Sequence, residues 1–263
     1  MVSSPNAWEK NMPADILELQ KISKSFGAHQ VIKDIDLKIG EGQVVGLLGP
    51  NGSGKSTLLN LISGFMPADS GTVLLRGTDI SRQAAPKIAG HGLVRTFQLP
   101  SMPTRMTVRQ VVQAGASRNG TVSSMFKAFR FDEEVDLLIE QFRLTAVADL
   151  PASSLSGGQK KLLSIATALR TKPQVLCLDE PTAGVHPELR GQMVQILKAC
   201  NARGVTILVI EHDMVFIRDL CGRAVVLDRG ALIADCPPNE LENNPRVVEA
   251  YLGKAVEKGK VSA

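Results

Sequence analysis

The sequence lacks the features that mark disulfide-rich, zinc-binding and membrane-spanning proteins. Its four cysteines lie far apart and form no CxxC pair, so we expect neither a zinc site nor a disulfide framework. This usage suits a reducing compartment, namely the cytosol. Residues 1–15 lack the apolar core of a signal peptide, and no apolar run approaches the roughly 20 residues that a membrane span requires. We therefore expect a protein that does not cross a membrane by itself.

Aromatic residues and long charged runs are also scarce. Aromatics make up 4% of the 263 residues, and no block of lysine and arginine is interleaved with them. The net charge of +4 gives weak support to nucleic-acid binding, and it suits a surface near anionic phospholipid equally well. We predict no nucleic-acid partner. The hydrophobic content of 44% is ordinary for a globular chain, and the length permits one or two domains.

What the sequence does contain is a glycine-rich loop that fits the phosphate-loop pattern of Gly, four residues, then Gly-Lys-Ser/Thr. Residues 44–48 before it predict a buried strand, and residues 58–62 after it predict a helix. Glycines let backbone N–H groups curl around an anion, and the helix directs its positive dipole end at that anion. The nucleotide-binding residues predicted here are Gly49, Pro50, Asn51, Gly52, Ser53, Gly54, Lys55, Ser56 and Thr57.

Two side chains of this loop have a chemical role of their own. The Lys55 ammonium supplies a mobile positive charge for the terminal phosphates of a nucleotide. The Ser56 hydroxyl can ligate Mg²⁺. ATP and Mg²⁺ are therefore the expected ligands.

The rest of the chain predicts strands and helices in alternation. Apolar–polar alternation predicts half-buried strands at residues 16–22, 35–39 and 72–80. Apolar segments predict, in chain order, strands at residues 92–98, 175–179 and 205–210, and a hairpin at 224–227 and 232–234. Helical spacing predicts helices at residues 108–114, 133–144, 159–169 and 187–200. Buried strands separated by helices indicate an α/β fold with a mainly parallel sheet and helices on both faces.

We expect a single domain over residues 16–253. Residues 99–150 are mostly helical and stand between two buried strands, so they predict an inserted helical subdomain. The early alternating strands predict an antiparallel β flank on the parallel sheet. Residues 1–15 and 254–263 are predicted to be a flexible leader and a flexible tail, and residues 117–124 a mobile loop between two helices.

An acidic pair closes the buried strand at residues 175–179. An acidic residue at the C-terminal end of such a strand can reach the Mg²⁺ held by Ser56, and we give this role, through water, to Asp179. Glu180 then points to the place of an attacking water, so we assign it as general base or water polariser. An Asp-Glu pair at a strand end is common by itself, and the phosphate loop is what favours the functional interpretation.

A second glycine motif opens the helix predicted at residues 159–169. Five fixed positions of this kind occur by chance with odds of order one in several thousand at average composition. The serine supplies a hydroxyl, the glycines allow close backbone approach, and a helix N-terminus follows, so we predict a second anion-binding surface. A head-to-tail dimer, in which each chain closes the other's ATP, explains two such surfaces in one chain. The motif follows Leu155 and consists of Ser156, Gly157, Gly158 and Gln159.

Taken in order, these motifs resemble the nucleotide-binding subunit of an ATP-binding cassette (ABC) transporter over nearly all of residues 16–253. The order is the phosphate loop, Gln98, the serine–glycine motif, Asp179 with Glu180, and His212. The resemblance implies the P-loop NTPase fold of ABC ATPases. It also implies an enzyme that hydrolyses ATP to ADP and phosphate and couples this to solute transport.

The resemblance assigns roles that the residues alone do not. It implies that Phe26 stacks on adenine, that Gln98 senses the metal and the attacking water, and that His212 contacts the γ-phosphate. Ser156 and Gly158 would serve the partner's nucleotide. An isolated Phe26 or His212 would as readily be structural, and the ordered set is what favours function.

One position departs from the family pattern. Many members have an aspartate in the loop after the catalytic glutamate, where it touches the dimer partner. Residues 181–187 here read Pro-Thr-Ala-Gly-Val-His-Pro, so His186 stands at that place. The usual contact with the partner is therefore in doubt at this position, where a histidine could titrate near neutral pH.

Further stretches are similar to ATPase subunits of branched-chain amino acid importers, and urea or short-chain amide importers share much of the pattern. The stretches are residues 95–98, 183–184, 211–214 and 244–253. The resemblance implies an ATPase dimer partner (self or paralogue), two transmembrane permease subunits and, indirectly, a periplasmic solute-binding protein. The chain would then be peripheral on the cytoplasmic face of the inner membrane, with the permease docked on the helical subdomain.

Two other function classes stay open at this point. Non-transport ABC ATPases that act on DNA or the ribosome usually carry tandem cassettes or long coiled coils. Residues 98–155 are too short for a long coiled coil, and the sequence contains a single phosphate loop, not the two of a tandem cassette. A binding module without hydrolysis is the second alternative. Lys55, Asp179, Glu180 and His212 together stand against it.

Overall fold

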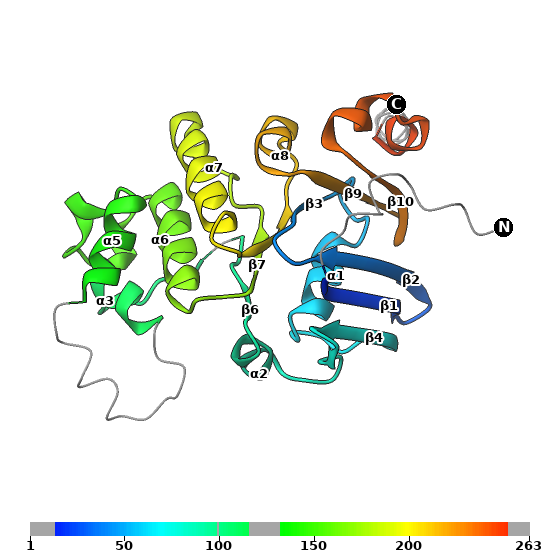
Figure 1. Ribbon diagram of the computed structural model, residues 1–263, viewed down its shortest axis with the longest axis horizontal. Helices are drawn as coiled ribbons and strands as arrows, with labels where there is room; N and C mark the ends of the chain where they lie inside the picture. The colour runs from blue at the N-terminus through cyan, green and yellow to red at the C-terminus, as the bar shows by residue number, and fades with distance from the viewer. Residues whose placement is uncertain (1–13, 99, 116–131, 252–263) are drawn as a thin grey trace.

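Two β-sheets, with helices packed on them, make up the part of the chain that the computed structural model describes, residues 14–98, 100–115 and 132–251 (Figure 1). The predicted tail and the loop predicted at residues 117–124 lie outside the described residues, as does all but the end of the predicted leader. The division into one domain with an inserted helical subdomain stays a prediction.

The larger sheet has six strands within the described residues, in the order β10-β9-β3-β8-β7-β6. Neighbouring strands from β9 to β6 run parallel, and β10 pairs antiparallel with β9. The strands are β3 (Val44–Leu48), β6 (Leu93–Arg95), β7 (Val175–Asp179), β8 (Thr206–Ile210), β9 (Arg223–Asp228) and β10 (Ala231–Cys236). The predicted strands and the hairpin are all present, although β6 is shorter than residues 92–98.

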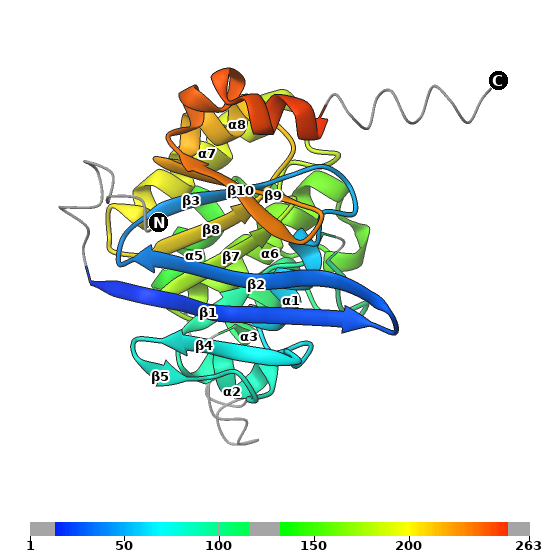
Figure 2. The ribbon, with the colours of Figure 1, turned by 90° about the vertical axis from the view of Figure 1, so that its right-hand side faces the viewer.

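The smaller sheet is antiparallel, in the order β2-β1-β4-β5, and lies alongside the parallel sheet (Figure 2). Its strands are β1 (Asp15–Phe26), β2 (His29–Gly40), β4 (Ser70–Leu75) and β5 (Thr78–Asp79). The first two strands extend beyond the predicted alternation because register shifts, including those around Lys21 and Asp34 with positive φ, let the pairing continue. This sheet is the antiparallel flank that the sequence predicts.

Helices cover one face of the parallel sheet, where α6 (Gly157–Arg170), α7 (Pro187–Asn201) and α8 (Met214–Leu220) pack, with α3 (Val108–Ala114) and α5 (Glu133–Gln141) farther out (Figure 1). The helix predicted at residues 133–144 ends early because the chain turns at Arg143, whose φ is 52°. Besides α1 (Lys55–Ile62), the other helical segments of the described residues are α2 (Ala85–Gly90), the 3₁₀ turns Thr145–Val147, Ala152–Ser154 and Pro238–Asn243, and residues 245–251.

The opposite face also carries a helix, as predicted, and shares it with the antiparallel sheet. There α1 (Lys55–Ile62) packs together with the antiparallel sheet in one apolar core. In β7, Leu176 and Leu178 enter the core under the helices, whereas Val175 and Cys177 enter the core shared with the antiparallel sheet. Since both faces are buried, the strand is apolar throughout instead of alternating. Burial raises the pKa of the Cys177 thiol to about 12, so this cysteine behaves as a small hydrophobic core residue.

The described residues include no helix with both the length and the apolar character of a membrane span.

Candidate functional site

The phosphate loop, Gln98, Glu180 and His212 lie where the parallel strands end. Parallel strands present their carboxyl ends at one edge of the sheet, which is where ligands bind in open α/β folds. Gly49 follows β3, Glu180 follows β7 and His212 follows β8, which lies between those two strands. Gln98 follows β6, the next strand beyond β7. Strand order therefore brings residues that are far apart in sequence to one edge.

The phosphate loop is shaped by glycines that its surroundings require. Gly49 has a φ of 146°, and a Cβ there would stand 2.0 Å from the carbonyl oxygen of Leu227. Gly54 has a φ of 108°, caps α1 without any side chain, and a Cβ there would stand 2.8 Å from Cδ1 of Ile32. An L side chain at either position would strain the backbone and clash with it or its neighbours. The loop thus holds the open backbone curve before a helix N-terminus that an anion needs.

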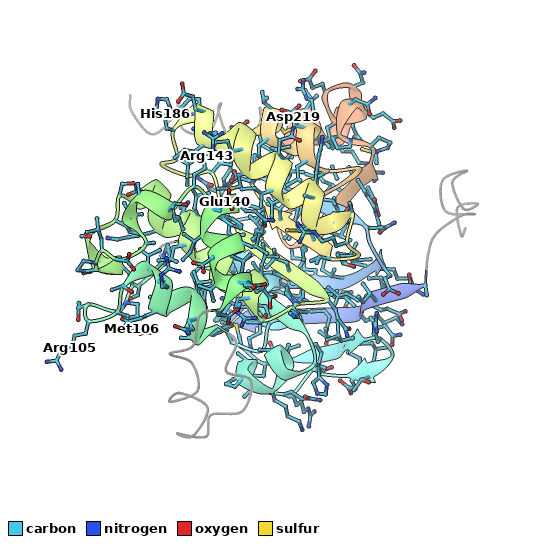
Figure 3. The ribbon with its side chains drawn as sticks, turned by 60° about the vertical axis from the view of Figure 1, so that its left-hand side comes forward. Arg105, Met106, Glu140, Arg143, His186 and Asp219 are labelled. Atoms are coloured by element: carbon cyan, nitrogen blue, oxygen red, sulfur yellow. The ribbon has the colours of Figure 1, made fainter. Side chains whose placement is uncertain are left out.

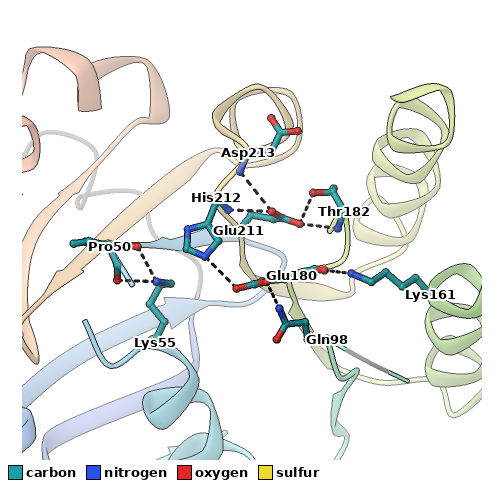
Figure 4. A network of polar contacts seen from close by, with 10 residues as sticks. Pro50, Lys55, Gln98, Lys161, Glu180, Thr182, Glu211, His212 and Asp213 are labelled. Carbon is teal, nitrogen blue, oxygen red and sulfur yellow. Dashed lines mark hydrogen bonds and ion pairs between the residues drawn. The ribbon is translucent and has the colours of Figure 1, made fainter. Parts of the chain in front are cut away.

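The Lys55 side chain is folded into this loop. Its ammonium is buried and donates hydrogen bonds to the carbonyl oxygens of Gly49, at 2.7 Å, and Pro50, at 3.1 Å (Figure 4). Ser56, one residue on, is exposed at the start of α1. Ser53 Oγ is buried and has no hydrogen-bond partner among the described residues. A cationic side chain, an exposed hydroxyl and an unpartnered hydroxyl at one helix N-terminus fit a nucleotide phosphate with a bound cation.

The Glu180 carboxylate lies between the two other residues predicted to be catalytic. Oε1 lies 3.1 Å from Nε2 of His212, and Oε2 accepts a hydrogen bond of 2.5 Å from Nε2 of Gln98 (Figure 4). An ionised carboxylate only accepts, so the histidine tautomer with the proton on Nε2 fits this contact. Glu180 itself has a φ of 46°, the left-handed region that is strained for a residue with a side chain. The three residues thus form one connected group at the strand edge.

Asp179 is buried and paired with an arginine that we did not predict. Its Oδ2 lies 2.7 Å from Nη2 of Arg95, and the two side chains are only 9% and 5% exposed. Arg95 also donates to Oδ1 of Asn60 at 2.5 Å and to Oγ of Ser63 at 3.2 Å, both on or just after α1. The ion pair ties the end of β7 to α1. The arginine appeared in the sequence only as part of a subfamily pattern, and no local motif indicated a partner 84 residues away.

Glu211 is a second buried acid that the sequence reasoning missed. Its Oε1 accepts hydrogen bonds from the backbone N–H and the hydroxyl of Thr182, each at 2.7 Å, and Oε2 accepts from the backbone N–H of His212 at 3.0 Å (Figure 4). The side chain is 3% exposed. Glu211 therefore joins the loop after β7 to the loop after β8, the two loops that carry Glu180 and His212.

Lys161 is the third missed residue. It lies on α6, is buried, and its ammonium donates a hydrogen bond of 2.5 Å to the backbone carbonyl oxygen of Glu180 (Figure 4). Burial lowers the pKa of this lysine, and the nearby carboxylates of Glu211, Glu180 and Asp179 oppose that shift. A buried lysine at helical spacing looks like part of the polar face in sequence, so its contact needed the fold to be seen.

The serine–glycine motif lies at the start of α6. The Ser156 hydroxyl accepts a hydrogen bond from the N–H of Gln159 at 3.3 Å, and Oε1 of Gln159 accepts one from the N–H of Ser156 at 3.0 Å. This is a capping box. A Cβ at Gly157 would meet nothing within 4 Å, and at Gly158 nothing nearer than 3.6 Å. In Figure 1, α6 stands well to one side of β3 and α1, so this motif and the phosphate loop lie at separate places on the chain.

Phe26 and His186 lie at exposed places. The Phe26 ring ends β1, is 48% exposed and has the Lys24 ammonium 5.8 Å from its centre. The β1–β2 hairpin runs beside the phosphate loop, because the Val31 carbonyl oxygen lies 3.0 Å from where a Gly54 Cβ would stand. His186 caps α7 with no side-chain hydrogen bond and projects away from the body of the molecule (Figure 3). Both positions are open to a ligand or another chain.

Comparison with known proteins agrees with this geometry. A family model described as ABC transporter matches residues 32–183. The chain is 35% identical over 255 residues to the high-affinity branched-chain amino acid transport ATP-binding protein BraF of Pseudomonas aeruginosa, covering 93% of this chain and 100% of that protein.

Two solved structures extend the comparison. An ATP-binding cassette of an ABC transporter in its ADP conformation is 34% identical, with a TM-score of 0.80 over 91% of this chain and 99% of that one. A dimeric cassette in a post-hydrolysis state with ADP and phosphate is 25% identical, with a TM-score of 0.74 over 84% of this chain and 98% of that one. The fold and the resemblance inferred from the sequence are confirmed, and the chain belongs to the ABC transporter family as one of its ATP-binding cassettes.

Proposed function

We propose that this chain is the ATP-hydrolysing subunit of an ABC importer for branched-chain amino acids. The observation that carries the proposal is the Glu180 carboxylate, held between Gln98 and His212 beside the phosphate loop. The similarity to BraF along the entire length of that protein supports the choice of solute.

The residues divide the work of hydrolysis. Backbone N–H groups of residues 51–57 and the Lys55 ammonium bind the phosphates, and the exposed Phe26 ring stacks on the base. Glu180 accepts a proton from the attacking water, while His212 holds the carboxylate and contacts the γ-phosphate. Stabilising developing charge and orienting water are the main tasks in phosphoryl transfer, because little covalent chemistry falls to the protein.

Ser56, Gln98 and Asp179 would hold Mg²⁺. Gln98 donates to Glu180 through Nε2, so its carbonyl oxygen is the atom that suits a cation. Asp179 is oriented by Arg95 through Oδ2. Bound Mg²⁺ supplies charge neutralisation at the β- and γ-phosphates.

The second glycine motif serves a partner cassette, either another copy of this chain or a paralogue. Ser156 and Gly158 lie at the start of α6 and away from the chain's own phosphate loop, so they would close the nucleotide of a facing chain. The existence of a dimeric cassette with bound ADP and phosphate supports this arrangement. Closure and reopening of two cassettes would move two permease subunits docked on the helices around α3 and α5, at the cytoplasmic face of the membrane.

Two measurements test the proposal. Phosphate release should fall to background in Lys55→Ala and in Glu180→Gln, with ATP binding retained in the second variant. Wild-type turnover in either would contradict the assignment. Uptake of labelled leucine, in cells that carry the chain with its permeases and binding protein, should require Lys55, whereas uptake of urea or a short-chain amide in its place would contradict the solute.

A further inference from the structure

Lys161 is a buried charged residue whose side chain contacts the backbone of Glu180 in the active site. It lies on α6, two residues after the serine–glycine motif, and is 7% exposed. Its ammonium donates to the Glu180 carbonyl oxygen at 2.5 Å, and that oxygen also accepts from the N–H of Ala183 at 3.3 Å. No role is given to Lys161 by the motifs of the sequence.

The contact is made to a peptide whose conformation needs support. Glu180 has a φ of 46°, which costs of order 1–3 kcal/mol for a non-glycine residue unless the surroundings hold it. Its N–H donates to the carbonyl oxygen of Ile210 at 2.9 Å, so β8 fixes one end of the residue and α6 fixes the other through Lys161. The direction of the Glu180 side chain follows from this backbone geometry.

The charge of Lys161 also suits this place. Burial lowers the pKa of Lys161, and the three carboxylates of Glu211, Glu180 and Asp179 oppose that shift because they favour the ammonium form. A charged donor makes a stronger hydrogen bond to a carbonyl than a neutral one. Lys161 thus links the helix that begins with Ser156 to the carboxylate at the end of β7.

We propose that Lys161 is a positioning residue that holds the catalytic carboxylate of Glu180 and ties it to helix α6. The inference rests on the proposed function, since it takes Glu180 as the base and the start of α6 as the surface for the partner's nucleotide. A movement of α6 on contact with that nucleotide then reaches the carboxylate that acts on the chain's own nucleotide. One lysine in this way couples the two ATP sites of a dimer.

The test compares steady-state ATP hydrolysis of Lys161→Met with that of wild type and of two further variants. Lys161→Met keeps the length and apolar stem but removes the donor, so kcat should fall by about tenfold with KM for ATP unchanged. Lys161→Arg restores a charged donor and should recover most of the turnover. Lys198→Met, which removes an exposed lysine of α7, is the matched control and should behave as wild type.

A double-mutant cycle separates positioning from general support of the fold. Because Lys161 acts through the Glu180 side chain, Lys161→Met should add no further loss to Glu180→Gln in single-turnover hydrolysis. A loss that multiplies in the double variant, a raised KM with unchanged kcat, or wild-type turnover in Lys161→Met would each overturn the proposal. If Lys161→Met does not fold, Lys161→Gln enters the same cycle with the same expected non-additivity.

The two ideas can fail separately. A wild-type chain that binds ATP without hydrolysing it would contradict the proposed function. An active wild type beside an equally active Lys161→Met would contradict only the role of Lys161.

Discussion

The two glycine motifs of this chain are built for opposite reasons. Gly49 and Gly54 have positive φ, and a Cβ at either would clash with neighbouring groups at 2.8 Å or less. Gly157 and Gly158 have neither property, because their φ is not in the left-handed region and no atom lies within 3.6 Å of a Cβ added to them. The chain's own packing therefore demands the first pair and leaves the second pair free.

The difference says where each motif finds its ligand. The phosphate loop is pre-shaped by the protein around it, so its anion is bound within one chain. At the N-terminus of a helix, glycine in place of alanine lowers stability, and the packing within the chain gives no reason for it. The serine–glycine motif therefore keeps its glycines for something outside the chain, which we infer to be the partner's nucleotide.

The largest effect is expected at Gly49. Gly49→Ala should lower the free energy of unfolding by about 3 kcal/mol or more, because the new Cβ meets the Leu227 carbonyl oxygen at 2.0 Å in a disallowed backbone conformation. Chemical denaturation monitored by circular dichroism measures this. Gly77→Ala is the control, since Gly77 has a φ of 73° but open space around it, and it should cost only about 1 kcal/mol. Equal losses in both variants would remove the clash from the explanation.

The next effect should appear in turnover and not in stability. Gly158→Ala should leave the free energy of unfolding within about 0.5 kcal/mol of wild type, because alanine suits a helix at least as well. ATP hydrolysis should nevertheless fall by about a hundredfold, since a Cβ would enter the space of the partner's nucleotide. Gly191→Ala on α7 adds a methyl group in equally open space, so it should leave hydrolysis unchanged and raise the free energy of unfolding by up to about 1 kcal/mol. Wild-type hydrolysis in Gly158→Ala would contradict the claim that the second motif keeps its glycines for the partner's nucleotide.

The smallest effect sharpens the comparison at the serine. Ser156→Ala removes the hydroxyl that accepts from the Gln159 N–H, so the free energy of unfolding should fall by about 1 kcal/mol. Ser156→Asp keeps a capping oxygen and should restore that stability, yet it places a negative charge against the partner's phosphate and should not restore hydrolysis. Thermal melting and phosphate release on the same samples give both quantities. Restored hydrolysis in Ser156→Asp would argue that the serine acts only as a cap.

The sequence predicted most of the fold because its signals are local. Apolar runs, turn glycines and the motif order indicated the strands, the helices and the family, and the ends of the parallel strands indicated which residues would meet. Predictions were weakest where distant packing decides. The helix predicted at residues 133–144 stops at Gln141 because Arg143 turns the chain.

The same limit applies to the site. Glu180 was predicted from the acidic pair at the end of a buried strand, whereas Gln98 and His212 were predicted through the family resemblance. Their supports were missed, because the partners of Arg95 and Lys161 lie 84 and 19 residues away in sequence. Buried charges that hold other residues in place carry no local pattern, and only the fold reveals what they contact.

Light scattering with Mg²⁺ and ATP tests the central claim most directly. It is measured on the Glu180→Gln chain alone and on the same chain mixed with a paralogous cassette of its system. The account predicts that ATP doubles the molar mass, and that Gly158→Arg in the same chain abolishes this doubling while ATP still binds. A molar mass that still doubles in Gly158→Arg would contradict a nucleotide shared between two chains. So would a molar mass that stays that of one chain in both samples while ATP binds.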